Sequence, residues 1–227
     1  MQSNTANQWG GASLAVERNR VLRNTYYLLS LTMIPTAIGA MAGIALQFHM
    51  SLMWGLLLFM GVSFGAFYAI ERTKNSPLGV VILLAWTGFM GLWLSQMLQR
   101  VLTFANGAEL IGMAAVGTGA IFFTLATIAT VTKKDFSFMG KFLFIGLVVV
   151  LLAVVANLFL QIPALSLTIS AVCVLLFSAY ILYDVSQIVN GGETNYVTAT
   201  LALYLDIYNL FTSLLSLLSA FSGNSRD

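Results

Sequence analysis

The chain has 227 residues, of which 59% are hydrophobic and only 8% are charged. A typical soluble domain carries about 25% charged residues, so this composition excludes an ordinary water-soluble globule. The net charge of +2 is too small and too dispersed to indicate a nucleic-acid partner, and a single cysteine excludes both an internal disulfide and a cysteine metal cluster.

Seven apolar runs separated by short polar connectors predict an all-α integral membrane protein, a bundle of seven transmembrane helices. The first run exceeds the roughly 7–15 apolar residues of a secretory signal peptide, so we expect it to remain as an uncleaved span. Residues 1–24 are predicted to form an N-terminal tail, residues 25–221 the transmembrane domain and residues 222–227 a short C-terminal tail. The predicted spans are residues 25–48, 51–70, 78–98, 109–131, 142–160, 164–189 and 197–221.

Proline and glycine residues mark helix ends and candidate helix contacts. Pro77 and Pro163 suit the first turn of a helix, and Gly191 can take the left-handed conformation that ends one. Pro35 lies inside the first run and predicts a kink there. Glycines also recur within two spans, and because such residues let membrane helices approach closely, we expect helix contacts there. These glycines are Gly61, Gly65, Gly112 and Gly119.

Basic residues are distributed unevenly between the two sides of the predicted bundle. Eight of the ten fall on the side that carries the N-terminal tail, and two, Arg100 and Arg226, fall on the other. Because short cytoplasmic segments of membrane proteins are enriched in Lys and Arg, we expect a cytoplasmic N-terminus. The eight residues are Arg18, Arg20, Arg23, Arg72, Lys74, Lys133, Lys134 and Lys141.

Two acidic residues lie inside apolar spans, whereas the other six lie in tails, connectors or helix ends. Asp184 belongs to the sixth span and Asp206 to the seventh. An ionisable residue inside a span costs about 2.5–3.5 kcal/mol on insertion scales, so each is a candidate functional group. The short turn between these spans makes them antiparallel neighbours, and at 1.5 Å per residue the two carboxyls differ in depth by about 6 Å. The two carboxyls are therefore expected to be able to meet.

A pair of carboxyls in a low-dielectric environment cannot ionise fully without strong repulsion, so one proton is shared between them. This arrangement predicts a pH-sensitive latch. The protonated pair is held by a hydrogen bond, whereas the ionised pair repels or recruits a cation. Asp184 and Asp206 also form a candidate calcium site, because calcium tolerates irregular oxygen ligands better than magnesium does.

Neighbouring polar residues are candidate partners of the pair. Gln187 lies three residues beyond the first aspartate and Asn209 three beyond the second, each on the same helical face as its aspartate. Tyr180 and Tyr204 can donate hydroxyl groups.

Two alternatives to an ionic latch have to be considered. In the first, the two aspartates have unrelated structural roles: Asp184 is hydrated near the membrane surface, and Asp206 hydrogen-bonds Asn157 or a backbone group. The second is an enzyme, but the sequence holds one histidine, no HExxH motif and no arrangement of serine, histidine and carboxylate for an intramembrane hydrolase. We therefore expect neither an enzyme nor a resident cofactor.

The segments around the two aspartates resemble a known family. Residues 180–188 (YILYDVSQI) and 202–211 (ALYLDIYNLF) are similar to the sixth- and seventh-helix motifs of the Bax inhibitor-1 family, also called the TMBIM family. Residues 21–26, 133–138 and 191–196 resemble its bacterial YccA branch in particular. The resemblance covers nearly the whole chain after the first twenty residues.

The resemblance implies a seven-helix bundle wrapped around a central helix and, from bacterial relatives, a pH-sensitive calcium leak gated by an aspartate pair. By motif these aspartates are Asp184 and Asp206. Relatives also use an arginine near the inner end of the second helix as a partner of the pair. Arg72 is the nearest candidate, although the local sequence Glu71-Arg72-Thr73-Lys74 departs from their arginine run.

The YccA branch further implies a bacterial inner-membrane protein that binds and restrains the membrane-anchored AAA+ protease FtsH. In this interpretation the protease grips the polar N-terminal tail, residues 1–24. Two functional hypotheses follow, a proton-gated calcium leak that depends on buried acids and a regulatory partner of the protease that depends on the tail.

Overall fold

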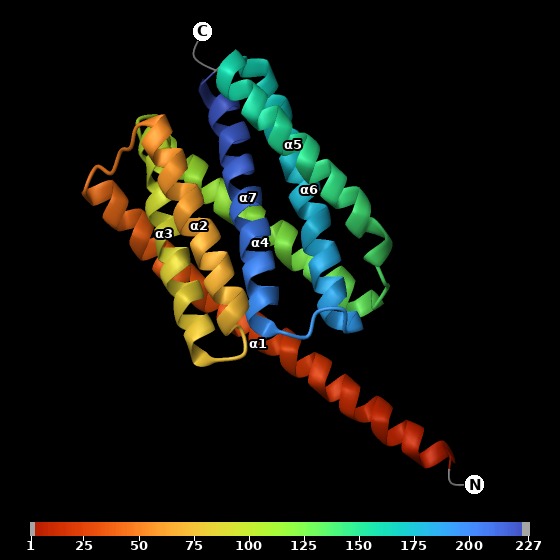
Figure 1. The fold of residues 1–227 in the computed structure, drawn as a ribbon. Helices are drawn as coiled ribbons and strands as arrows, with labels where there is room; N and C mark the ends of the chain where they lie inside the picture. The colour runs from red at the N-terminus through yellow and green to blue at the C-terminus, as the bar shows by residue number, and fades with distance from the viewer. Residues whose placement is uncertain (1–2, 224–227) are drawn as a thin grey trace.

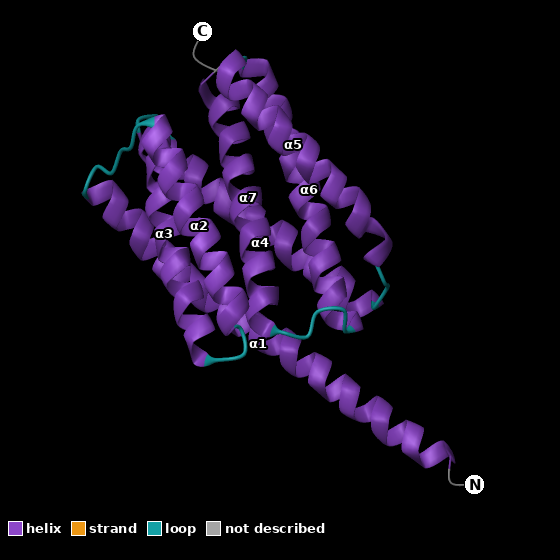
Figure 2. Cartoon of the chain, viewed as in Figure 1, coloured by secondary structure: helices purple, strands orange, loops and turns teal. Residues whose placement is uncertain are grey.

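The computed structural model describes the backbone of residues 3–223 and the side chains of residues 16–222. Within this range the chain forms seven α-helices, one 3-10 turn and no strand (Figures 1 and 2). All seven helices are long and apolar enough to cross a membrane, so the predicted all-α, seven-helix fold is confirmed. The helices are α1 (Ser3–Ala45), α2 (Leu52–Thr73), α3 (Pro77–Leu102), α4 (Gly107–Thr132), α5 (Gly140–Leu160), α6 (Pro163–Asn190) and α7 (Tyr196–Gly223), with the 3-10 turn η1 (Ser137–Met139) before α5.

The first helix is longer than expected. It begins at Ser3 rather than at residue 25, and Figure 1 shows its N-terminal part projecting away from the bundle. Residues 3–24 contain no proline, so nothing in the covalent chain stops the helix there. Hydropathy marks only the apolar part of such a helix, and the residues before 25 include Glu17, Arg18, Arg20 and Arg23. The helix also continues through Pro35 without a break.

Helix α7 is the centre of the bundle. It packs against α1, α2, α3, α4 and α6, whereas α5 packs mainly against α6 at the edge. The predicted central helix is therefore α7. Because five helices surround α7, its side chains are shielded from both lipid and water. Four of them are fully buried: Leu203, Tyr204, Leu210 and Leu215.

The two ends of the bundle are named here by the chain termini. The N-side carries the projecting part of α1 and the α2–α3, α4–α5 and α6–α7 connections, and the C-side carries the other connections and the end of α7 (Figure 1). Pro77 and Pro163 lie in the first turns of α3 and α6, as predicted. Gly191 ends α6 with a φ of 81°, and its N–H group bonds the Ile188 carbonyl, so this expectation is also confirmed.

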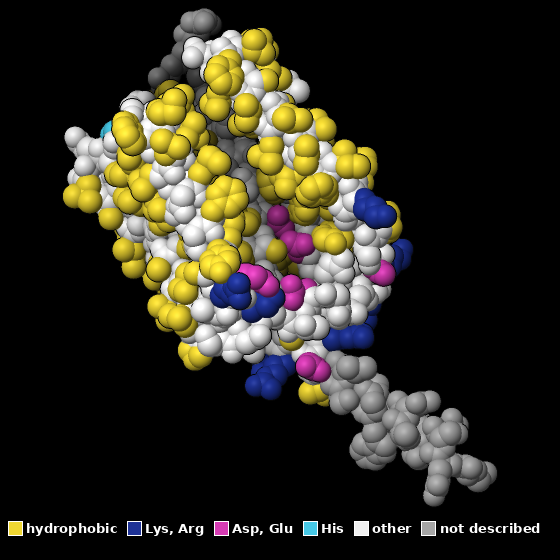
Figure 3. Space-filling model, in the orientation of Figure 1, with side chains coloured by type: hydrophobic (Ala, Val, Ile, Leu, Met, Phe, Trp, Pro, Cys, Tyr) yellow, Lys and Arg dark blue, Asp and Glu magenta, His cyan; other side chains and the backbone are white. Residues whose placement is uncertain are grey.

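The outer surface is that of a protein surrounded by lipid. Large apolar side chains face outward along the helices, and Phe159 on α5 is 82% exposed. In Figure 3 hydrophobic side chains cover most of the visible face, while Lys and Arg side chains gather toward the N-side. A soluble protein would not expose so much continuous apolar surface.

Helices α1 and α3 make the closest approach in the bundle through glycines that the sequence did not single out. A Cβ on Gly39 would lie 2.0 Å from the Gly88 carbonyl oxygen, and one on Gly91 would lie 2.0 Å from the Thr36 carbonyl oxygen. The expectation for the four glycines of α2 and α4 was wrong, because a Cβ there would meet nothing within 4 Å. These are Gly61, Gly65, Gly112 and Gly119.

Replacing Gly91 with Ala is expected to destabilise the folded protein by about 1–3 kcal/mol, because the new methyl group meets a backbone carbonyl that cannot rotate away. The measurement is the midpoint of thermal unfolding in detergent. Gly61→Ala is the matched control: its methyl group meets open space and should leave the midpoint unchanged or slightly higher. Equal midpoints for the two variants would contradict the close α1–α3 packing.

Candidate functional site

The structure brings the two membrane aspartates together. Asp184 on α6 and Asp206 on α7 lie on neighbouring antiparallel helices, and their carboxyl groups share a hydrogen bond. Asp206 is only 5% exposed, and Asp184 is half-buried. Asn157, the structural partner considered for Asp206, instead donates to the Ser166 hydroxyl at 2.7 Å.

A hydrogen bond between two carboxyls requires a proton on one of them, because an ionised carboxylate can only accept. Neither aspartate is in an ion pair with Lys or Arg within the described residues, where the ion pair found is Lys74–Glu71. One oxygen of Asp206, Oδ2, is buried without a hydrogen-bond partner. The pair therefore includes an unsatisfied acceptor, and such an acceptor has a free-energy cost unless a proton, water or cation reaches it.

Two of the predicted partners lie beside the pair. Tyr180 lies one turn before Asp184 on α6, close to both aspartates. Gln187 lines the same cavity as Asp184. Both are on the face of α6 that turns toward α7, as their spacing of three and four residues requires.

The structure does not place the other three predicted partners at the pair. Asn209 donates to a carbonyl of its own helix at 2.8 Å. Tyr204 lies two residues before Asp206 and so faces nearly the opposite side of α7, where its hydroxyl meets the Thr36 hydroxyl at 2.9 Å. Arg72 is exposed at the end of α2, with its guanidinium 5.3 Å from the centre of the Tyr68 ring.

A cavity of about 240 Å³ lies on the N-side of the pair and is lined by Asp184 but not by Asp206. Its walls come from the end of α6, the α6–α7 connection and the first turns of α7. Besides Asp184 and Gln187, it is lined by Glu193, whose carboxylate acts electrostatically on Asp184. Small residues of α7, Ala199 and Ala202, leave room for the cavity. Figure 3 shows acidic side chains in a hollow near the middle of this face.

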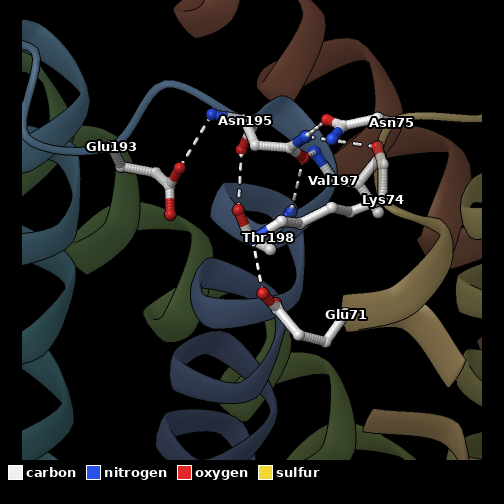
Figure 4. A network of polar contacts seen from close by, with 7 residues as sticks. All are labelled: Glu71, Lys74, Asn75, Glu193, Asn195, Val197 and Thr198. Atoms are coloured by element: carbon white, nitrogen blue, oxygen red, sulfur yellow. Dashed lines mark hydrogen bonds and ion pairs between the residues drawn. The ribbon is translucent and has the colours of Figure 1, made fainter. Parts of the chain in front are cut away.

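An asparagine two residues after Glu193 holds the α6–α7 connection in place (Figure 4). The Asn195 side chain donates to the Lys74 carbonyl at 3.2 Å and to Asn75 Oδ1 at 2.8 Å, which ties the α6–α7 connection to the α2–α3 connection. Its own oxygen accepts the first backbone N–H groups of α7, as a helix cap does. Glu193 Oε1 accepts the Asn195 N–H at 2.7 Å, which positions the acid that lines the cavity.

Sequence reasoning missed Glu193 and Asn195 because both fall in a polar connector. An available signal was the sequence of that connector: an acid and an asparagine directly after the two glycines that end α6, between the two helices that carry the aspartates. An asparagine just before a helix is a common cap. Nothing in the sequence indicated that its side chain also reaches the α2–α3 connection.

Polar side chains continue from the pair toward the C-side along the α6–α7 interface. The Cys173 thiol contacts the Ser213 hydroxyl, and Ser170 Oγ donates to Ser216 Oγ at 3.1 Å. The last two hydroxyls line a C-side cavity of about 990 Å³. The buried ring of Phe177 lies on α6 between this file and the acid pair.

The described residues contain no group of three or more His, Cys, Asp or Glu side chains that could hold a metal ion. Calcium normally takes six to eight oxygen ligands, so the aspartate pair alone does not form a closed calcium cage. Any cation at the pair would be held by two carboxyls and by water.

Comparison with known proteins gives a consistent result. The family profile described as "Inhibitor of apoptosis-promoting Bax1" matches residues 18–223. The protein named "Modulator of FtsH protease YccA" of Escherichia coli K12 is 45% identical over 200 residues, which cover 88% of this chain and 90% of that protein. A protein of Escherichia coli O6:H1 with the same identity and coverage is named "Inner membrane protein YccA". An uncharacterized membrane protein of Vibrio cholerae is 42% identical over 209 residues, covering 92% of this chain and 93% of the relative.

Proposed function

Since this chain belongs to the Bax inhibitor-1 family, we propose that it is a multi-pass membrane protein that leaks cations, calcium above all, under the control of a shared proton. The observation that carries the proposal is the hydrogen-bonded pair of Asp184 and Asp206 inside the bundle. A pair of acids without a basic partner is costly in a membrane, and such groups mark ion or proton pathways.

The control follows from the charge of the pair. With one proton shared, the hydrogen bond holds α6 against α7 and the pair carries one negative charge. When that proton leaves, two carboxylates face each other beside Tyr180 and Glu193, and they repel unless a cation lies between them. Loss of the proton thus both loosens the helix contact and creates a cation site, so the leak increases as the pH rises.

A route for the ion is supported by the cavities. The N-side cavity reaches Asp184, and the hydroxyls of Ser213, Ser170 and Ser216 lead from the pair toward the C-side cavity. In this proposal the buried ring of Phe177, which lies on α6 between the pair and these hydroxyls, closes the route while the pair is protonated. Two carboxyls favour a hard cation such as calcium. Because they supply only part of its usual oxygen ligands, we expect the cation to bind weakly and to leave quickly.

The excess of Lys and Arg in its connections supports a cytoplasmic N-side. By the name of the E. coli relative, the membrane is the bacterial inner membrane. The test of the leak is calcium flux through vesicles that contain the purified protein, measured at mildly acidic and mildly alkaline pH. Flux should exceed that of protein-free vesicles and rise with pH; flux equal to theirs at both values would exclude a leak.

A second function is supported by a different observation. The E. coli relative is named a modulator of the FtsH protease, and it matches this chain over nearly its whole length. In addition, α1 projects from the N-side as a helix that the bundle does not cover (Figure 1). We propose that this projection engages FtsH. The two functions use different parts of the molecule, so one protein can have both.

A further inference from the structure

A groove runs between α1 and α4, apart from the acid pair. Both helices pack against α7, but within the described chain they make no close backbone contact with each other. Two cavities of about 580 and 370 Å³ lie in this groove and share the wall residues Leu29, Ser30, Phe122 and Phe123. On α1 they extend from Tyr26 to Ile44, a length of about 27 Å, most of the thickness of a bilayer core. We call this feature the α1–α4 groove.

The α1–α4 groove fits hydrocarbon better than a helix. Its walls are almost entirely apolar, and the tyrosines of its floor use their hydroxyls inside the protein: Tyr204 with Thr36, and Tyr208 with the Met90 carbonyl at 3.3 Å. A helix of the same length and 10 Å diameter occupies about 2,000 Å³, far more than these cavities provide. A single acyl chain is narrow and flexible enough to follow them.

The N-side mouth of the groove is basic. On α4 the groove ends at Thr130 and Val131, and the exposed Lys133 and Lys134 follow after one further residue. On α1 the exposed Arg23 lies one turn before Tyr26. None of these cations is in an ion pair within the described side chains.

The two lysines also have a fixed position. Lys133 ends α4 in a left-handed conformation with φ 50°, and the Lys134 carbonyl accepts hydrogen bonds from Ser186 and Asn190 of α6. Hydrogen bonds from Ser137 to the neighbouring Asp135 lower the pKa of this acid, so it stays ionised. Two lysines and one arginine against one aspartate leave the mouth positively charged.

We propose that the α1–α4 groove binds an anionic phospholipid from the membrane leaflet on the N-side. One acyl chain lies in the groove, and the phosphate lies between Lys133, Lys134 and Arg23. Basic pockets between membrane helices recognise anionic head groups in this way, at about 1 kcal/mol per Lys or Arg. This site is independent of the cation leak and of the protease.

The test is native mass spectrometry of the full chain, released from detergent after addition of phosphatidylglycerol or of phosphatidylethanolamine with the same acyl chains. The unmodified protein should retain phosphatidylglycerol preferentially. The double variant Lys133→Gln, Lys134→Gln should lower its affinity about fivefold per lysine, and the matched double variant Lys74→Gln, Lys141→Gln, which removes two N-side lysines outside the groove, should not.

The groove itself is tested with a filling substitution. Gly119→Trp adds a ring inside the α1–α4 groove, where a Cβ meets nothing within 4 Å, and should reduce phosphatidylglycerol retention at least about threefold. Gly61→Trp adds the same ring on the exposed face of α2 and should retain the lipid. Equal retention of the two lipids, or unchanged retention in Gly119→Trp, would overturn the proposal. So would lipid-free dimers that Gly119→Trp converts to monomers, because the occupant would then be a second copy of the chain.

Discussion

Replacing Asp206 with Asn is expected to remove the pH dependence of calcium flux while preserving the fold. Titration of one proton can change the fraction of molecules that conduct, and hence the calcium flux, by up to about tenfold per pH unit. In the variant the flux should change by less than about twofold per pH unit. The Asn amide has nearly the same shape as a carboxyl and donates permanently to Asp184, so it imitates the protonated pair and keeps the flux low at every pH. The measurement is calcium release from vesicles across a pH series. Asp184→Asn should also abolish the pH dependence.

The control for this experiment is Asp135→Asn. It makes the same change of charge at an acid of the α4–α5 connection that is exposed and lies away from the pair, so its flux should follow the unmodified protein. Unmodified pH dependence in both Asp184→Asn and Asp206→Asn would mean that the pair is structural. A low flux without pH dependence in these variants would support the pair as the proton sensor.

Removal of residues 1–15 is expected to abolish association with FtsH while leaving the seven apolar spans intact. The apolar run of α1 starts near residue 25, well after the deleted segment, so the deletion shortens only the part of the helix that precedes it. Recovery of FtsH with the purified protein should fall at least about tenfold, which corresponds to about 1.4 kcal/mol or more of lost binding. Overexpression of the full chain should also lengthen the lifetimes of unstable membrane proteins, and the truncated chain should not.

Two variants separate the protease from the leak. Asp206→Asn should retain FtsH, because the pair is buried inside the bundle, and the truncated chain should retain a pH-dependent flux. Replacement of residues 1–15 by a Gly/Ser segment of equal length distinguishes a need for this sequence from a need for length alone. If FtsH is recovered equally with the full and the truncated chain, the projecting helix is not the contact.

The Asn195 contacts suggest how the N-side responds to the pair. The side chain ties the α2–α3 connection to the α6–α7 connection, and the backbone N–H of the same residue donates to Glu193, which lines the cavity (Figure 4). A movement of α6 relative to α7 would therefore also act on these hydrogen bonds.

Features that depend on local chemistry and chain length could be predicted from the sequence. The seven spans follow from hydropathy, and the ends at Pro77, Pro163 and Gly191 follow from backbone geometry. The meeting of Asp184 and Asp206 was also within reach, because a short turn forces α6 and α7 together and their depths along the membrane can be counted. The error at the start of α1 had a local cause too, since hydropathy measures the apolar part of a helix and not the helix itself.

What only the tertiary structure decided is how each helix is rotated and which helix it meets. Gly61 and Gly119 have the spacing of contact residues but face open space, whereas Gly39 and Gly91 make the close approach. Tyr204 is two residues from Asp206, and yet its hydroxyl contacts Thr36 of α1 on the other side of α7. A sequence specifies the order of side chains around one helix, but the partner of each face is chosen by the packing of all seven. The composition thus determined that this protein spans a membrane and that two acids remain there, and the packing decided which groups surround them.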